Sequence, residues 1–112
     1  MTRTVVAATV SPDGAIGGGL GKAHWMAIAS VADGAITDWR VDEVRWDELH
    51  DEGGEGAHHA RIVRFMRDNE VQHVVAAHAG PPMQNTLSKL GIRLHMGAAG
   101  DARQAVLAAL AG

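Results

Sequence analysis

Two nearly continuous apolar runs predict strands that are buried on both faces of a sheet. They cover residues 5–10 and 74–79, and both are rich in valine and alanine. A strand without polar alternation needs packing partners on each of its faces. A shorter apolar segment at residues 92–96 predicts a further strand.

A β-hairpin is predicted between the two long runs. Residues 25–31 form its first strand, and Asp33-Gly34 follows at once. Both turn residues tolerate the positive φ that a tight hairpin turn requires. A third strand is expected over residues 36–46. Its apolar alternation shifts after Val41, which indicates a bulge or a half-exposed edge position.

Three segments have the spacing of amphipathic helices, at residues 58–69, 81–90 and 102–110. The second begins with two prolines, which a first helical turn tolerates. Asp101 is a suitable N-cap for the third. The acidic, glycine-bearing segment 47–56 predicts a mobile loop before the first helix.

The order of these elements restricts the topology. Each strand–helix–strand unit requires parallel strands joined by a right-handed crossover. The hairpin makes the second strand antiparallel to the first and third strands. The natural solution is a five-stranded mixed sheet of order 3-2-1-4-5 with three helices distributed over both faces. The sequence therefore predicts a single α/β domain, residues 1–112, of ribonuclease-H-like topology.

Composition narrows the class of protein. The 112 residues include no cysteine, which excludes disulfides, thiolate zinc sites and an iron–sulfur cluster bound through the chain's own thiolates. The net charge of −3 argues against a general nucleic-acid binder. No apolar run approaches the ~20 residues of a membrane span. The first residues lack the hydrophobic core of a signal peptide, so a cytoplasmic protein is expected.

The richest source of candidate chemistry is the set of seven histidines. The carboxyl ends of the parallel strands share one edge of the predicted sheet, here called the rim, where open α/β sheets usually bind ligands. Helix N-termini at the rim would favour an anion. His73 belongs to the opposite edge, and the facing of His95 stays open. The histidines expected at the rim are His24, His50, His58, His59 and His78.

The candidate metal ligands are His58, His59 and His78, with His24 as a fourth. Each of these histidines also has an ordinary structural alternative to metal binding: packing at a helix start, hydrogen bonding to a turn, or exposure to solvent. Met83 likewise has helical core spacing with Leu87. Backbone N–H groups of the glycine-rich segments would add contacts. The candidate cofactor-binding residues are Gly17, Gly18, Gly19, Gly80, Pro81, Met83 and Gly97.

The chain does not match the sequence motifs of nucleotide-binding proteins or of nucleases. The segment from Gly17 to Lys22 resembles a phosphate-binding loop, but three residues separate its outer glycines where four are needed, and Ala23 replaces the Ser/Thr. A strand follows instead of a helix, which argues against a dinucleotide fingerprint. The central strands carry no carboxylate for a two-metal site. No nucleotide cofactor is expected.

Several short motifs follow one another in a specific order. They are Asp13-Gly14 after the first strand, Gly21-Lys22-Ala23 before the second, the Asp33-Gly34 hairpin, and residues 74–83 and 90–100. In this order the chain resembles the dinitrogenase iron–molybdenum cofactor biosynthesis family, which includes NifX-like and NifB C-terminal-like domains, over nearly its whole length.

The resemblance implies a ribonuclease-H-like fold, and binding or carriage of iron–molybdenum cofactor or its precursors rather than catalysis. Many members carry His-Phe-Gly just before the second strand, where this chain reads Gly19-Leu20-Gly21. The chain therefore resembles a cysteine-free variant branch of the family.

Two hypotheses of different classes follow. The leading one is a non-enzymatic carrier domain that holds an anionic metal centre or iron–molybdenum-type cluster at the rim and exchanges it with a donor or acceptor protein. The alternative is an interaction module without small ligand, in which Trp25, Trp39 and Trp46 form a homodimer or partner surface. A metal-dependent hydrolase is a third possibility, but it lacks a convincing acidic partner. No nucleic-acid or membrane partner is expected.

Overall fold

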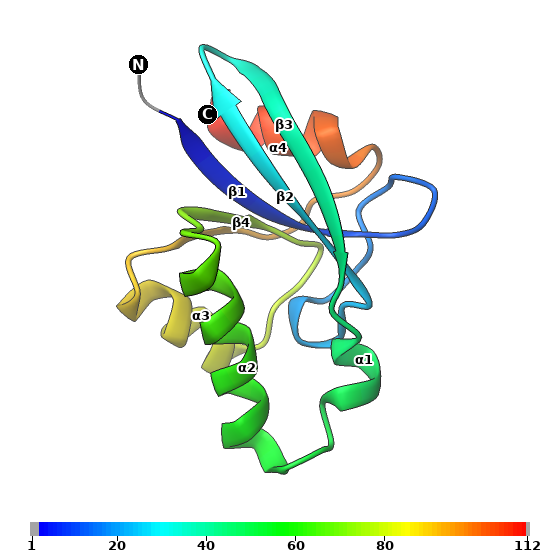
Figure 1. The fold of residues 1–112 in the computed structure, drawn as a ribbon, viewed down its shortest axis with the longest axis vertical. Helices are drawn as coiled ribbons and strands as arrows, with labels where there is room; N and C mark the ends of the chain where they lie inside the picture. Colours follow the sequence, from blue (N-terminus) through cyan, green and yellow to red (C-terminus); the bar gives the residue numbers. More distant parts are fainter. Residues whose placement is uncertain (1–2, 112) are drawn as a thin grey trace.

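A five-stranded sheet organises residues 3–111, the part of the chain that the computed structural model describes (Figure 1). The sheet has the order 3-2-1-4-5. β2 is antiparallel to β1 and β3, and β4 and β5 follow the direction of β1. The predicted order and strand directions are therefore confirmed, while residues 1, 2 and 112 of the predicted domain lie outside the described residues. The strands are β1 (Thr4–Val10), β2 (Trp25–Ala32), β3 (Ala35–Glu43), β4 (His73–Val75) and β5 (Arg93–His95).

Helices cover both faces of the sheet, as predicted. One face carries α2 (Gly54–Asp68), α3 (Pro81–Lys89) and the short α1 (Trp46–Leu49), and the other carries α4 (Ala102–Ala111) (Figure 1). A 3-10 turn, η1 (Leu20–Lys22), precedes β2. The described residues thus contain one α-helix more than the three predicted. None of these helices is both long and apolar enough to cross a membrane.

Strict alternation along β1 divides the core into two layers. Val5 and Ala7 pack on the side of α2 and α3, whereas Val6 and Ala8 pack on the side of α4. All four side chains are at most 6% exposed. The continuous apolar run therefore forms a strand that is buried on both faces, as its sequence predicts.

The hairpin turn between β2 and β3 has the predicted conformation. Asp33 and Gly34 have φ values of 53° and 77°, the left-handed pair of a type I′ turn. The pairing register shifts between Ser30 and Val31, where Thr37 is the extra residue of β3. The strand therefore contains a bulge, but earlier than the shift in apolar alternation suggested.

The clearest correction concerns Trp46. The strand expected over residues 36–46 ends at Glu43, because Arg45 adopts a left-handed conformation (φ 57°) and directs the chain into α1. Trp46 is 2% exposed and meets Phe65 edge to face, with 5.3 Å between the ring centroids. Burial of the indole in the core replaces the edge position that the strand would have given it.

Other boundaries differ for similar tertiary reasons. The segment 47–56 was expected to be a mobile loop, but it contains most of α1 and the start of α2. The strands predicted over residues 74–79 and 92–96 are both shorter in the structure. Beyond Val75 the chain no longer pairs with β1, and an isolated bridge joins His78 to Gly19.

Replacing Trp46 with Ala is expected to lower the free energy of unfolding by about 3–5 kcal/mol, the usual cost of deleting a large buried aromatic side chain. The matched variant Trp39→Ala removes a partly exposed indole from β3 and should cost clearly less. Urea unfolding followed by circular dichroism measures both losses. Equal losses would contradict the core position of Trp46.

Candidate functional site

The glycine-rich segment 17–21 lies at the centre of the rim and is fixed by backbone contacts. The N–H of Gly17 donates to the carbonyl of Thr9 at 2.9 Å, and the buried Thr9 hydroxyl donates to the carbonyl of Gly18 at 3.2 Å. Ala77, beyond β4, donates its N–H to the same Gly18 carbonyl at 3.1 Å. A Cβ on Gly17 would lie 2.7 Å from the carbonyl oxygen of Val10, so the backbone approach there requires glycine.

Two of the predicted ligands contact this segment from different elements. His78, beyond β4, accepts a hydrogen bond at its carbonyl from the N–H of Leu20 at 2.9 Å, and its side chain is exposed. His58, in α2, places its Nε2 2.7 Å from the carbonyl oxygen of Gly21. The fold therefore brings two histidines that are distant in the sequence to one short stretch of the rim.

The imidazole of His58 is already fully engaged. It is 7% exposed, its Nε2 donates to Gly21, and its Nδ1 accepts from the guanidinium of Arg61 at 2.9 Å. This pattern requires the neutral tautomer with the proton on Nε2. The same guanidinium also donates to the carbonyl of Leu49 at 3.1 Å. In this arrangement His58 positions the glycine segment and has no ring nitrogen free for a metal.

A hollow at the rim separates Lys22 from the start of α2. It is lined by Lys22, His50, His58 and His59, and also by Asp51, whose carboxylate lies 3.1 Å from His50 Nδ1. His59 is half-buried, and its ring makes no hydrogen bond within the described residues. Gly53, at the N-cap of α2, offers no side-chain cap to the first turn. Lys22, the imidazoles and the uncapped helix N-terminus favour a negatively charged ligand, whereas Asp51 opposes one.

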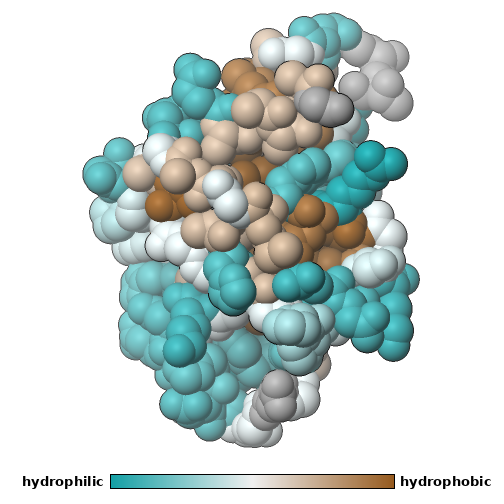
Figure 2. Space-filling view, turned by 180° about the vertical axis from the view of Figure 1, so that it is seen from behind, coloured by the Kyte–Doolittle hydropathy of each residue, from teal (hydrophilic) through white to brown (hydrophobic). Residues whose placement is uncertain are grey.

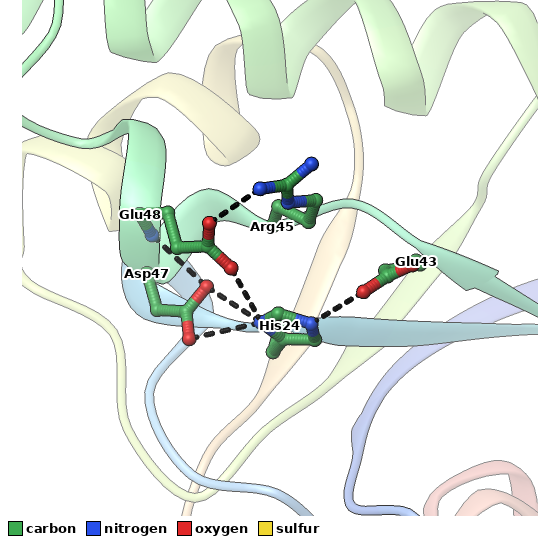
Figure 3. A network of polar contacts seen from close by, with 5 residues as sticks. All are labelled: His24, Glu43, Arg45, Asp47 and Glu48. Carbon is green, nitrogen blue, oxygen red and sulfur yellow. Dashed lines mark hydrogen bonds and ion pairs between the residues drawn. The ribbon is translucent and has the colours of Figure 1, made fainter.

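His24, just before β2, has the opposite surroundings (Figure 3). Its Nδ1 lies 2.9 Å from Asp47 and its Nε2 lies 2.7 Å from Glu43. Glu48, which pairs with Arg45, lies 3.5 Å from Nδ1. Because carboxylates can only accept, both ring nitrogens donate and the ring is an imidazolium. The hydrogen bond to Glu43, followed by that to Asp47, raises the pKa of His24 above its ordinary value of 6.5.

The His24 cluster suits a cation better than an anionic centre. Among the described residues, His24, Asp47 and Glu48 are the one group whose ligand atoms all lie within 4.8 Å of one another. Two exposed carboxylates would repel an anionic cluster. His58, His59 and His78 do not form such a preassembled group in this part of the chain.

The remaining candidate residues fall into two environments. Gly80 and Pro81 form the start of α3, and Gly97 follows β5 and donates its N–H to the carbonyl of Ala77 at 3.0 Å. Met83 is 5% exposed and belongs to the core below α3. Its thioether is therefore a packing group, in agreement with its helical core spacing.

The three long helices differ in what their N-termini offer at the rim. Pro81 and Pro82 occupy the first turn of α3 and carry no N–H. The first turn of α4 is capped by Asp101, which accepts from the N–H of Gln104 at 2.9 Å. The N-terminus of α2, without a side-chain cap, is therefore the one that best fits an anion.

A further pair of histidines lies at the opposite edge of the sheet. His73 Nδ1 and His95 Nε2 are 3.0 Å apart, and their rings stack at 22°. Burial, followed by the charges of His95 and Arg93, lowers the pKa of His73 below its ordinary value. The sequence analysis left the facing of His95 open, because the contact depends on the register between β4 and β5.

The fold and the rim define a class of protein: a small α/β domain of ribonuclease-H-like topology with a glycine-rich segment and histidines at the carboxyl edge of its sheet. The chain belongs to the dinitrogenase iron-molybdenum cofactor family, whose sequence profile matches residues 1–112. No curated protein matches the chain.

Several solved structures share this fold. The crystal structure of PH0822 has a TM-score of 0.74 and 17% identity, covering 96% of this chain and 89% of that one. A candidate dinitrogenase from Methanocaldococcus jannaschii, mj0327, has a TM-score of 0.72 and 13% identity, covering 100% and 92%. A candidate NifB protein from Thermotoga, TM1290 of the DUF35 family, has a TM-score of 0.71 and 17% identity, covering 97% and 89%. At these identities the likeness supports the fold alone.

The pKa of His24 is expected to exceed 6.5 when its ring is titrated by NMR. Glu43→Gln should lower this pKa more than Asp47→Asn, because the Glu43 hydrogen bond contributes most. Asp68→Asn, on an exposed residue at the end of α2, is the matched control. Since the folded state binds this proton more tightly than the unfolded state, the associated stability is present below about pH 6.5 and is lost as the pH rises through the folded-state pKa. An unshifted pKa would contradict the network.

Proposed function

We propose that residues 1–112 act as a non-enzymatic carrier domain for an anionic metal centre, with an iron–molybdenum-type cluster as the leading candidate. The family supplies the class of ligand. The observation that carries the proposal is the convergence of His78 and His58 on residues 18–21 at the rim. The cluster would be the cargo of the domain, held at the carboxyl edge of the sheet.

The accessible donors fit an anion that must later be released. His78 and His59 carry ring nitrogens without a protein partner among the described residues, so they are the preferred ligands. The N–H groups of Gly18, Gly19 and Gly80 donate no hydrogen bond to protein in the same part of the chain. Backbone N–H groups of this kind bind anionic oxygen or sulfur atoms. With no cysteine in the chain, attachment would depend on these exchangeable donors.

Neighbouring residues would support the bound anion without contributing all its ligands. His58 holds Gly21 in place, and Lys22 adds positive charge to the hollow beside His59. Gly17 and Gly97 fix the turns on either side. His24 would stay outside the coordination shell, because its carboxylate neighbours repel an anion.

Binding and release, rather than catalysis, would be the task of this domain. A cofactor donor or acceptor protein in the cytoplasm would then load and unload it at the exposed rim. Because the ligand side chains come from the loops after β4 and from α2, a partner could reach them without opening the core.

The test is the iron and molybdenum content of protein purified anaerobically, measured by elemental analysis. The double variant His59→Ala/His78→Ala is expected to lose most of the bound metal, because both free imidazoles are removed. Lys89→Ala, on an exposed residue at the end of α3, is the matched control and should keep the content of the native protein. A double variant that retains all of its metal would show that the rim does not hold the cargo.

A specific observation favours homodimerisation as a second candidate function. Half-exposed Trp25 and Trp39 line a hollow with Val41, which is 46% exposed, and Arg103 lies 4.6 Å over the Trp39 ring. Apolar residues gather on the face that carries α4 (Figure 2). Trp46, included in the expected surface, is buried and takes no part.

We therefore expect Trp39→Gln and Val41→Gln to shift the molar mass measured by light scattering from dimer to monomer, because each removes apolar area from this surface. Leu90→Gln changes a residue that is 40% exposed at the end of α3, on the other face of the sheet, and is the matched control. A native chain that is monomeric at high concentration would rule out this second candidate.

A further inference from the structure

The opposite edge of the sheet holds a histidine cluster that the proposed function does not use. Val75 packs on the face of α4, so His73, two residues earlier in the same strand, lies on that face as well. Leu94 packs against the other layer, which places its neighbours Arg93 and His95 on the α4 face. The register of β4 with β5 therefore brings both imidazoles and one guanidinium together.

The distance between the two facing ring nitrogens matches the distance between two nitrogens that bind one metal ion. A metal–nitrogen bond of about 2.0–2.1 Å places two nitrogens on one ion about 2.8–3.4 Å apart in square-planar or tetrahedral geometry. His73 Nδ1 and His95 Nε2 are 3.0 Å apart. In the hydrogen bond between them one ring donates and the other accepts, and both rings would rotate to direct their lone pairs at one ion.

We propose that His73 and His95 form a chelating pair for a divalent transition-metal ion that prefers imidazole, such as Zn²⁺. The ion replaces the hydrogen bond between the rings: the donor ring loses the proton at the shared nitrogen and takes one up from solvent at its other nitrogen, so that both neutral rings present a lone pair and two metal–nitrogen bonds form. Water completes the coordination shell. The site is distinct from the rim and does not depend on the anionic cargo.

The charges around the pair favour a cation over an anion. The hollow that His73 and His95 line also contains residues 107–111 at the end of α4. That helix has no basic residue in its last turn, so the partial negative charge of its terminal carbonyls is not offset from within the helix. Asp33 lines the same hollow and adds a carboxylate, whereas Arg93 opposes a cation.

Titration of the protein with ZnCl₂, followed through the imidazole ¹⁵N resonances, tests the site. The resonances of His73 Nδ1 and His95 Nε2 should shift together and saturate at one ion per pair, with no net proton released where both rings start neutral. His95→Ala and the milder His95→Gln should each abolish the Zn²⁺-dependent shift of His73. Arg93→Gln should tighten binding by removing the opposing charge. His24→Ala, which alters the rim cluster, should leave the shifts of the pair unchanged.

Two results would overturn the proposal. One is a His73 shift that survives removal of His95, since a single imidazole would then be the binder. The other is a pair that ignores Zn²⁺ but responds to inorganic phosphate, with the response lost in Arg93→Gln, because the cluster would then be an anion site. Backbone spectra of the variants establish that they are folded. Loss of cargo in the rim variants is measured independently, so either proposal can fail without the other.

Discussion

The hydrogen bond from the N–H of Leu20 to the carbonyl of His78 connects the core to the rim. Leu20 is fully buried among the residues of the α2 and α3 layer, so its side chain anchors the glycine segment from below. Its N–H ties that segment to the extension of β4 at 2.9 Å. Gly19 forms an isolated bridge with His78, so the extension of β4 lies beside the glycine segment.

The rim divides into two zones of opposite character. Around Lys22 and His59 there are a lysine, imidazoles and an uncapped helix N-terminus, with one carboxylate, Asp51, that pairs with His50. Around His24 there are carboxylates from β3 and α1, which keep that ring protonated. Such separation lets one edge of a small sheet attract an anion at one place while it excludes the anion from another.

Local patterns predicted the parts of the fold that depend on local chemistry. The apolar run of β1 and the Asp33-Gly34 turn are examples, because burial on both faces and positive φ leave direct marks in the sequence. Trp46 could not be placed this way, since the left-handed Arg45 that redirects it has no sequence signal. The engagement of His58 likewise depends on a contact with Gly21 from a distant element. The predicted topology placed the histidines at one edge of the sheet. The hydrogen bonds and protonation of each ring, however, depend on neighbours that only the tertiary structure provides.

The value of each histidine as a ligand follows from what its ring would have to give up. His58 would lose bonds to Gly21 and Arg61, and the glycine segment would lose one of the contacts that hold it. His24 would have to lose a proton that two carboxylates stabilise. His59 and His78 would exchange only water, because their rings bind no protein group in the described residues. Imidazoles without protein hydrogen bonds therefore suit a ligand that is bound and later transferred, and neighbouring residues whose own hydrogen bonds stay intact hold them in position.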